Sequence, residues 1–251
     1  MMAGEDERGH RQIVDLKTAL QLLAEGEMVE HGVIPWSSNY ALLVSVRHGE
    51  RQMLAIYKPR RGERPLWDFP VGTLYLREYA AYLLSEALGW ELVPPTVLRD
   101  GIYGPGTVQI YIDSDPEQHF FNVYPRHADD YRRIALFDIV ANNADRKAGH
   151  CLLDAQGHMW SIDHGICFHA EPKLRTVIWE FAGEPIPAAE HAALEHLRDR
   201  LEPGQPLRDA FCRLLQEEEV EAMCRRLQRL LESGRFPHPD PHRRNHPWPP
   251  I

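Results

Sequence analysis

Two neighbouring stretches decide the fold: Asn142-Asn143-Ala144-Asp145-Arg146-Lys147-Ala148-Gly149-His150 and Ile162-Asp163-His164-Gly165. Between them lies a predicted hairpin, with Cys151–Leu153 and Met159–Ile162 as strands around the turn Asp154-Ala155-Gln156-Gly157. Because one aspartate precedes the hairpin and the other follows it, the two carboxylates are expected to converge on one place. Phosphoryl transfer needs such a pair, one carboxylate to orient a nucleophile and one to hold a metal ion.

The part of the chain before residue 113 is predicted to be mostly antiparallel β structure. Apolar and β-branched runs bounded by turn residues are typical of strands, and helically spaced apolar residues that end at a glycine indicate helices. The predicted strands are Tyr40–Val46, Met53–Tyr57, Thr96–Ile102 and Thr107–Ile112, and the predicted helices are Ile13–Ala24 and Leu74–Leu88.

The part that follows is predicted to be mostly helical up to Ser233. Its helices are expected at about Asp130–Ala141, Leu174–Phe181, Ala188–Leu201 and Leu207–Leu231. We therefore predict an α+β fold, a single domain with an N-lobe over 12–113 and a C-lobe over 114–233. From Arg235 onward the chain contains six prolines and three histidines, so residues 234–251 are expected to be an extended or disordered tail with few backbone hydrogen bonds to a core.

Composition excludes several classes of protein. The 251 residues carry 28 basic and 37 acidic side chains, a net charge of -9, which argues against nucleic acid as a partner. No apolar stretch approaches the roughly 20 residues of a membrane span, so an integral membrane protein is not expected. The polar beginning of the chain and the absence of CxxC spacing among four cysteines indicate a reducing, cytoplasmic protein.

Four charged residues form the inventory that phosphoryl transfer requires. Lys58 stands at a strand end, Glu78 lies in the next helix, and Asp145 and Asp163 flank the hairpin. A lysine can hold nucleotide phosphates, and an acid can hold that lysine. Each residue alone is commonplace, but their order along the chain is not.

Four motifs resemble those of the phosphatidylinositol 3-/4-kinase-like fold. The motifs are Tyr57-Lys58-Pro59, Arg77 to Leu84, Asn143-Ala144-Asp145-Arg146 and Ile162-Asp163-His164-Gly165. They are most similar to type II phosphatidylinositol 4-kinases and, more distantly, to HipA-type bacterial protein kinases, over about Gly32 to Phe168. The resemblance implies a two-lobed protein-kinase-like fold and a bacterial branch of that family.

The resemblance also implies roles for individual residues. Lys58 would contact the α- and β-phosphates of ATP and Glu78 would pair with it. Asp145 would be the catalytic aspartate, and Asp163 would hold Mg²⁺ or Mn²⁺. The implied activity is an ATP- and metal-dependent phosphotransferase of the EC 2.7 class.

Two positions depart from the pattern of that family. The loop expected to cover the phosphates, Ile34 to Asn39, lacks glycine, so Ser37, Ser38 and Asn39 are the residues that could bind nucleotide. Five residues after Asp145 the family has Asn as a metal ligand, whereas this chain has His150. Imidazole suits Mn²⁺ better than Mg²⁺. Asn142 and Asn143 are alternative sources of an amide oxygen.

Other functions remain open at this point. A pseudokinase, a nucleotide-binding or scaffolding module without transfer, would explain the loop without glycine and His150. A zinc-binding protein would use imidazoles and thiols near the hairpin, namely His150, Cys151, His158, His164, Cys167 and His169. The acceptor is unknown, and the net charge favours a protein or small molecule over a lipid. The basic cluster is Lys58, Arg60, Arg61 and Arg64.

Overall fold

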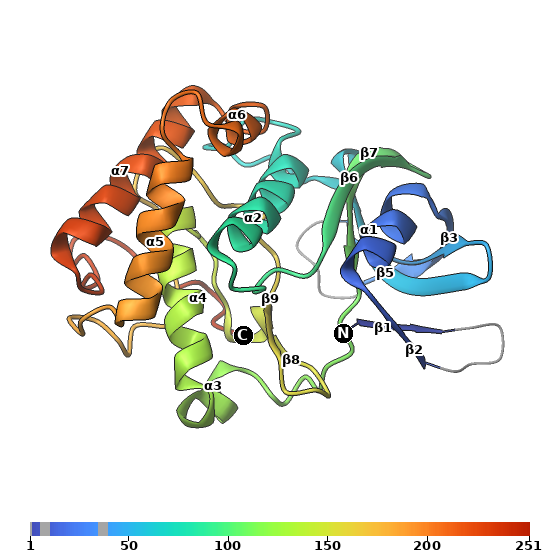
Figure 1. Ribbon diagram of the computed structural model, residues 1–251, viewed down its shortest axis with the longest axis horizontal. Coiled ribbons are helices and arrows are strands. Elements are labelled where there is room, and N and C mark those ends of the chain that lie inside the picture. Colours follow the sequence, from blue (N-terminus) through green and yellow to red (C-terminus); the bar gives the residue numbers. More distant parts are fainter. Residues whose placement is uncertain (1, 6–10, 35–39) are drawn as a thin grey trace. The chain divides into compact units, whose positions relative to one another are not determined.

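The computed structural model describes residues 2–5, 11–34 and 40–251, and for 2–5 and 11–14 it describes the backbone alone. The chain divides into two compact units. The first unit consists of Met1–Tyr82 and Pro94–Ile112, and the second consists of Leu83–Val93 and Asp113–Ile251. Figure 1 shows the strands of the first unit in blue and green and the helices of the second from green to red.

An antiparallel sheet forms the first unit. Within the described residues its strands are β1 (Met2–Glu5), β2 (Arg11–Val14), β3 (Glu27–Val33), β4 (Leu42–His48), β5 (Arg51–Pro59), β6 (Thr96–Gly101) and β7 (Gly104–Ile110). The pairing runs β3, β4, β5, β7, β6, and the β1–β2 hairpin joins β5 through Glu5 and Gln52. The predicted antiparallel β structure is confirmed, while β1, β2 and β3 had not been predicted.

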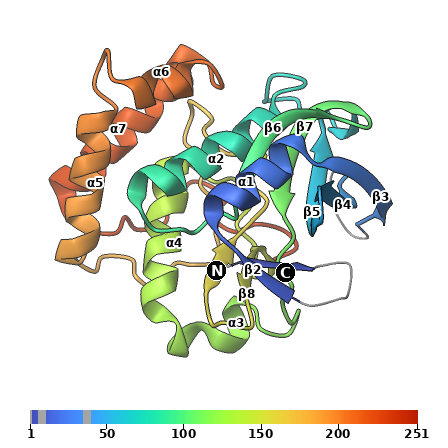
Figure 2. The ribbon, with the colours of Figure 1, turned by 45° about the vertical axis from the view of Figure 1, so that its right-hand side comes forward.

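One face of this sheet makes the core of the first unit. In β5 the side chains of Met53, Ala55 and Tyr57 are buried, and they pack with apolar residues of β4 and β7. Helix α1 (Leu16–Glu25) packs against β6 and adds Leu22 and Leu23 to this core (Figure 2). Because side chains alternate along a strand, Lys58 points to the face opposite Tyr57.

Helix α2 (Leu74–Leu88) is shared by the two units, since residues 74–82 belong to the first and 83–88 to the second. Its first turn is held by the Glu63 side chain, whose Oε1 accepts a hydrogen bond from the Tyr75 N–H at 2.8 Å. Arg77 is buried, and its guanidinium lies 4.8 Å from the ring centroid of Phe69. Glu78 follows on the same helix.

The second unit is mostly helical, as predicted. Its elements are α3 (Phe120–Val123), α4 (Ala128–Ala141), α5 (Ala188–Arg200), α6 (Pro206–Cys212), α7 (Glu217–Ser233) and the hairpin β8 (Cys151–Leu153) and β9 (Met159–Ser161). Short 3-10 turns are η1 (Arg60–Gly62) in the first unit and η2 (Tyr124–Arg126) and η3 (Ala148–His150) in the second. Helix α7 packs against α4, α5 and α6 (Figure 1).

Two helix predictions in the second unit are wrong. Residues 174–181 form no helix, because their backbone hydrogen-bonds to residues distant in sequence: the Arg175 N–H donates to Asn143 O at 2.9 Å and the Val177 N–H to Arg146 O at 3.1 Å. The predicted helix Leu207–Leu231 is broken between α6 and α7, where Gln216 caps α7. The periodicity of apolar residues indicates neither these long-range hydrogen bonds nor the break between α6 and α7.

The Pro/His-rich segment after Ser233 has no helix, yet it makes several hydrogen bonds to the second unit. Phe236 is 3% exposed, and its N–H and carbonyl pair with Glu184 and Gly183. The carbonyl of Asn245 accepts hydrogen bonds from the Thr176 N–H at 3.0 Å and from Trp179 Nε1 at 3.1 Å. The expectation that this segment contributes few backbone hydrogen bonds is therefore wrong.

Candidate active site

Lys58 and Glu78 form an ion pair in the first unit. Lys58 Nζ lies 2.5 Å from Glu78 Oε1, and the two side chains are 18% and 5% exposed. Strand β5 supplies the lysine on its non-core face, and the first half of α2 supplies the glutamate. An ion pair this close holds the ammonium group at a fixed place, as a phosphate-binding lysine requires.

Asp145 lies in the loop that follows α4, in the second unit. The α4 helix ends at Asn142, which has a left-handed conformation with φ 52°. Asn143 then turns back, and its Oδ1 accepts a hydrogen bond from the Asp145 N–H at 3.0 Å. Burial raises the pKa of Asp145 to about 6, and the carboxylate of Asp163 adds to this rise while Lys147 opposes it.

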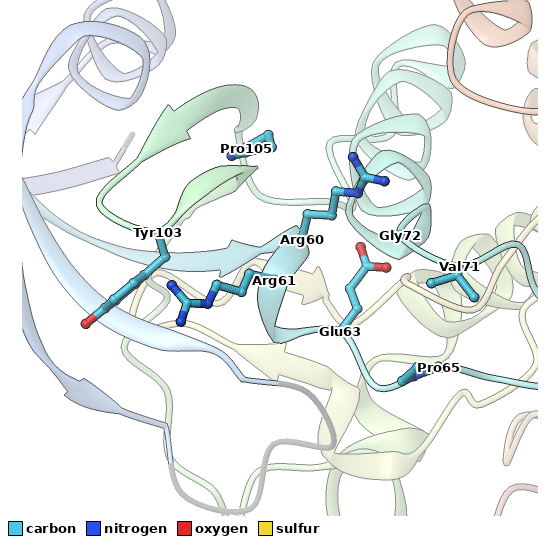
Figure 3. A pocket seen from close by; sticks show the side chains of 8 residues that line it. All are labelled: Arg60, Arg61, Glu63, Pro65, Val71, Gly72, Tyr103 and Pro105. Carbon is cyan, nitrogen blue, oxygen red and sulfur yellow. The ribbon is translucent and has the colours of Figure 1, made fainter.

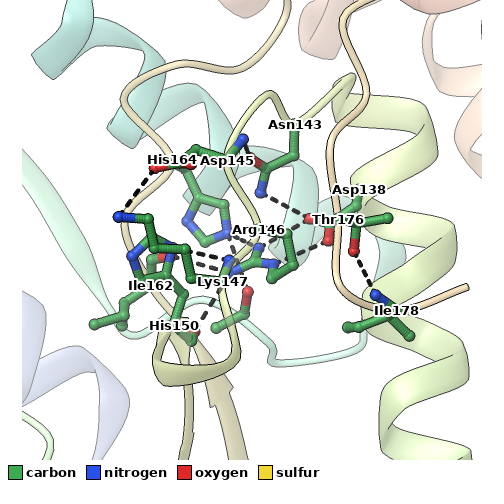
Figure 4. Close-up of polar contacts among 11 residues, drawn as sticks. Asp138, Asn143, Asp145, Arg146, Lys147, His150, Ile162, His164, Thr176 and Ile178 are labelled. Carbon is green, nitrogen blue, oxygen red and sulfur yellow. Dashed lines mark hydrogen bonds and ion pairs between the residues drawn. The ribbon is translucent and has the colours of Figure 1, made fainter. Parts of the chain in front are cut away.

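A buried network around Arg146 fixes this loop (Figure 4). The Arg146 guanidinium donates to both oxygens of Asp138 at 2.9 Å, and both side chains are fully buried. It also donates to the carbonyls of His150 and Ile162, at 3.3 and 3.1 Å. Arg146 thus ties the segment after Asp145 to the segment before Asp163, so one side chain positions both aspartates.

His164 completes the network. Its Nε2 lies 2.8 Å from an Arg146 nitrogen and 3.1 Å from Ser161 Oγ. Since a guanidinium can only donate, Nε2 of His164 is the acceptor and carries no proton. His164 is fully buried and packs against the ring of Phe137 at 5.2 Å, so its role is to support the loop.

Asp163 has a left-handed backbone, with φ 62°, a conformation that is uncommon outside glycine and that clusters at functional sites. The His150 imidazole lies beside it, with Nε2 3.4 Å from Asp163 Oδ2. The hairpin therefore brings His150 and Asp163 together, and the pKa of Asp145 responds to Asp163. His150 and Asp163 thus lie together in the second unit, where the charge of Asp163 also acts on Asp145, while Lys58 and Glu78 pair in the first.

Asn142 and Asn143 use their side-chain amides to hold the loop. Oδ1 of Asn142 accepts a hydrogen bond from the Lys173 N–H at 2.8 Å, and its Nδ2 donates to the carbonyls of His169 and Glu171. Oδ1 of Asn143 is taken by the Asp145 N–H, and its Nδ2 donates to Asp138 at 2.9 Å. Both asparagines therefore shape the loop.

The donor atoms of these residues suit a magnesium site better than a structural zinc site. Over the described ranges, no three His, Cys, Asp or Glu side chains cluster closely enough to hold a metal ion by themselves. Structural zinc needs four such ligands, whereas Mg²⁺ usually takes one or two carboxylates and completes its shell with water and substrate phosphates. The 36% exposed carboxylate of Asp163 fits the second pattern.

Three of the predicted nucleotide-binding residues, Ser37, Ser38 and Asn39, lie outside the described residues. No role in phosphoryl transfer was predicted from the sequence for Asp138, Arg146 or His164. A signal existed for one of them: Asp138 is an acidic residue on the buried side of an apolar helix, beside Phe137. A charge in that place needs a partner.

Solved structures show which fold the chain has. Two kinase structures resemble the chain: the proinflammatory kinase CtkA of Helicobacter pylori (TM-score 0.53, 12% identity, 85% of this chain and 94% of that one) and the Golgi casein kinase (TM-score 0.51, 13% identity, 91% and 80%). A second Golgi casein kinase structure, with Mn/ADP bound, also matches, with a TM-score of 0.51, 13% identity and coverage of 86% and 74%. The predicted α+β, protein-kinase-like fold is thereby confirmed.

Sequence relatives give the family. Residues 103–219 match the family model of phosphatidylinositol 3- and 4-kinase. The matched region continues beyond Phe168, the end of the region over which the sequence motifs resemble that family. The chain belongs to the family of Protein Rv2133c of Mycobacterium tuberculosis, with 41% identity over 91% of this chain and 94% of that protein. Phosphatidylinositol 4-kinase gamma 4 of Oryza sativa subsp. japonica is 30% identical over 46% of this chain and 24% of its own. The resemblance to the phosphatidylinositol 3-/4-kinase-like family is confirmed.

Proposed function

We propose that the protein is an ATP- and divalent-metal-dependent phosphotransferase that acts on a protein or small-molecule acceptor. The observation that carries the proposal is the Arg146 network, which fixes the segments of Asp145 and Asp163 side by side. The Lys58–Glu78 ion pair supports it from the first unit. The Mn/ADP found in the related Golgi casein kinase structure supports the choice of nucleotide and metal.

In the proposed reaction Asp145 receives the proton of the acceptor hydroxyl, whose oxygen forms a bond to the γ-phosphorus of ATP. The bond from that phosphorus to the β,γ-bridging oxygen breaks, and ADP leaves with the electron pair. Lys58 holds the α- and β-phosphates in place, and Glu78 holds Lys58. Asp163 and His150 would bind a divalent metal, which offsets the charge that develops on the phosphates.

The function is tested by incubating the purified protein with ATP and either Mg²⁺ or Mn²⁺, and measuring ADP release and the mass of protein and acceptors. Asp163→Asn is expected to abolish the metal-dependent thermal shift with ATP. Asp145→Asn is expected to keep that shift and to lose transfer by at least about 10²-fold. ATP binding without transfer in the wild type would identify a pseudokinase, and activity unchanged in both variants would refute the assignment of the site.

The pKa of Asp145 gives a second expected result. The base must be ionised, and its pKa is raised to about 6, so kcat should fall about tenfold for each pH unit below 6. In the folded protein burial opposes ionisation, so Asp145→Asn should leave the melting temperature at pH 7 unchanged or higher. A pH series of kcat, with melting temperatures for both proteins, measures both. A profile that is flat from pH 7 to 5 would contradict this role.

His150 sets the expected preference for metals. If its imidazole helps Asp163 to bind the metal, Mn²⁺ should support more activity than Mg²⁺, since an imidazole ligand disfavours Mg²⁺. His150→Asn should then raise the ratio of Mg²⁺ to Mn²⁺ activity, and metal binding by the wild type should weaken as the pH falls through about 6.5. His158→Asn is the control, because His158 bonds to the Glu91 carbonyl instead. An equal ratio in all three proteins would exclude His150 as a ligand.

The cellular compartment and the preference against a lipid acceptor are both inferred from the sequence. No helix in the described part of the chain has both the length and the apolar character to cross a bilayer. The cytoplasmic location inferred from the sequence, and the preference for a protein or small-molecule acceptor over a lipid, remain parts of this proposal. For the alternative of a zinc-binding protein, the described ranges contain no cluster of three or more His, Cys, Asp or Glu side chains that could hold the metal ion.

A further inference from the structure

A positive charge lies beside Asp145 on a segment that comes later in the chain. The backbone around Arg175 pairs with the loop of Asp145 at a parallel bridge between Arg146 and Thr176. The Arg146 N–H donates to the carbonyl of Arg175, and the Arg175 N–H donates to the carbonyl of Asn143, both at 2.9 Å. These bonds involve residues on either side of Asp145, so they fix the backbone of Arg175 next to it.

The register of this bridge places the side chains of Arg175 and Asp145 on one face. Paired residues of neighbouring extended segments point to the same face, and the residue before each points to the opposite face. The paired residues Arg146 and Thr176 are both buried, whereas Asp145 and Arg175 are both partly exposed. Burial raises the pKa of Asp145, and the charge of Arg175 is one of the influences that lower it. The guanidinium and the carboxylate are thus near neighbours.

The guanidinium of Arg175 is available to a ligand. It forms no hydrogen bond or ion pair with any side chain or carbonyl in the described ranges. Lys147 is the other cation beside Asp145, and its Nζ lies 3.7 Å from Oδ2 of that carboxylate (Figure 4). The ammonium group is therefore engaged by Asp145 itself, while the planar fork of Arg175 is left over. A single guanidinium suits one carboxylate, which it can bind through two parallel N–H···O bonds.

The basic cluster of the first unit does not concentrate its charges on one place. A pocket of about 400 Å³ is lined there by Arg60, Arg61 and Glu63, among other residues. Figure 3 shows Arg60 extending toward α2 and Arg61 extending toward Tyr103, in opposite directions. Because these two guanidinium groups diverge, they do not form a joint site for an anion. The search for a group that recognises the acceptor therefore leads to Arg175.

We propose that Arg175 determines the specificity for the acceptor by binding a carboxylate that lies close to the hydroxyl that receives the phosphoryl group. This inference rests on the transfer reaction proposed above, in which Asp145 receives the proton of that hydroxyl. A carboxylate held by Arg175 brings the hydroxyl of the same molecule to Asp145, so it contributes orientation as well as affinity. Two sources offer this chemistry: a serine or threonine peptide with a nearby acidic side chain, and a free hydroxy acid.

Transfer is measured with matched acceptors in which an amide replaces the carboxylate. One set consists of serine peptides with a single Glu within three residues of the serine, and the same peptides with Gln. The other set is glycerate and glyceramide. In at least one set, kcat/KM from ADP release and product mass should be at least about tenfold higher for the carboxylate. The set that shows the preference identifies the source of the carboxylate, and equal, measurable rates within both sets would overturn the proposal.

Three variants make the test specific to this side chain. Arg175→Gln should bring the ratio of carboxylate to amide rates to about one, and Arg175→Glu should favour a Lys peptide over its Glu counterpart. Both should keep a melting temperature within a few degrees of the wild type, since the guanidinium has no partner to lose. Arg225→Gln, at an exposed arginine of α7, is the control and should keep the wild-type ratio. A carboxylate preference retained by Arg175→Gln would refute the role of Arg175.

Binding without transfer separates this inference from the proposed function. The same acceptors are titrated into the ¹⁵N-labelled protein without ATP or metal, and the amides of residues 143–147 and 174–178 are followed. Saturable shifts are expected with the carboxylates only and should be lost in Arg175→Gln. Such shifts without ADP release from any acceptor would refute the transfer reaction while supporting carboxylate binding by Arg175. If neither the shifts nor the rates distinguish carboxylate from amide, the inference is overturned.

Discussion

Arg146→Met is expected to lower the free energy of unfolding by about 3–5 kcal/mol and to abolish phosphotransfer. Arg146 and Asp138 are both fully buried, so the substitution leaves the Asp138 carboxylate in the interior without its partner. It also removes the donors to the carbonyls of His150 and Ile162, which position the two aspartates. For a chain of this length the melting temperature should fall by roughly 10 °C. Thermal unfolding and the ADP-release assay measure the two effects.

A double variant separates stability from positioning. Replacing both partners, Arg146→Met with Asp138→Leu, removes the uncompensated charge and should recover much of the lost stability. It cannot restore the hydrogen bonds to the loop, so activity should stay absent. Arg133→Met is the control, because its ion pair with Glu190 is partly exposed and should contribute less than about 1 kcal/mol. Activity regained by the double variant would show that the network is structural only.

Ending the chain after Ser233 is expected to lower the melting temperature by roughly 10 °C or more. The removed segment includes the buried ring of Phe236, worth about 3–5 kcal/mol, and leaves N–H groups of Gly183 and Thr176 without acceptors. Phe236→Ala alone should account for most of the loss. A melting temperature unchanged by the truncation would mean that these contacts add nothing to stability.

A shorter truncation tests a link to the loop that carries Asp145. The carbonyl of Pro250 accepts a hydrogen bond from the Ala148 N–H at 2.8 Å, three residues after Asp145. Ending the chain after Trp248 removes this acceptor but keeps Phe236 and Asn245. The melting temperature should change by only a few degrees, while kcat falls and the KM for ATP is unchanged. If both truncations lowered the melting temperature equally, the prediction that the last three residues act mainly on kcat would be contradicted.

Much of the fold could be predicted because the signals are local. Alternating burial along β5 and the glycine-ended helices α1 and α2 follow from the periodicity of apolar residues. The order Lys58, Glu78, Asp145, Asp163 pointed to phosphoryl transfer, and the structure pairs the first two at 2.5 Å. The edge strand β3 was missed because its side chains are mostly exposed, so it carries no apolar pattern.

The sequence by itself determined the class of fold and the residues that could perform the chemistry, since both depend on local pattern and on residue type. Tertiary structure alone decided how those residues are held. The partner of Asp138, the extended course of residues 174–181 and the acceptor for the Ala148 N–H all come from distant segments. Buried polar groups must find partners wherever the chain brings them, and local periodicity carries no record of which partners those are.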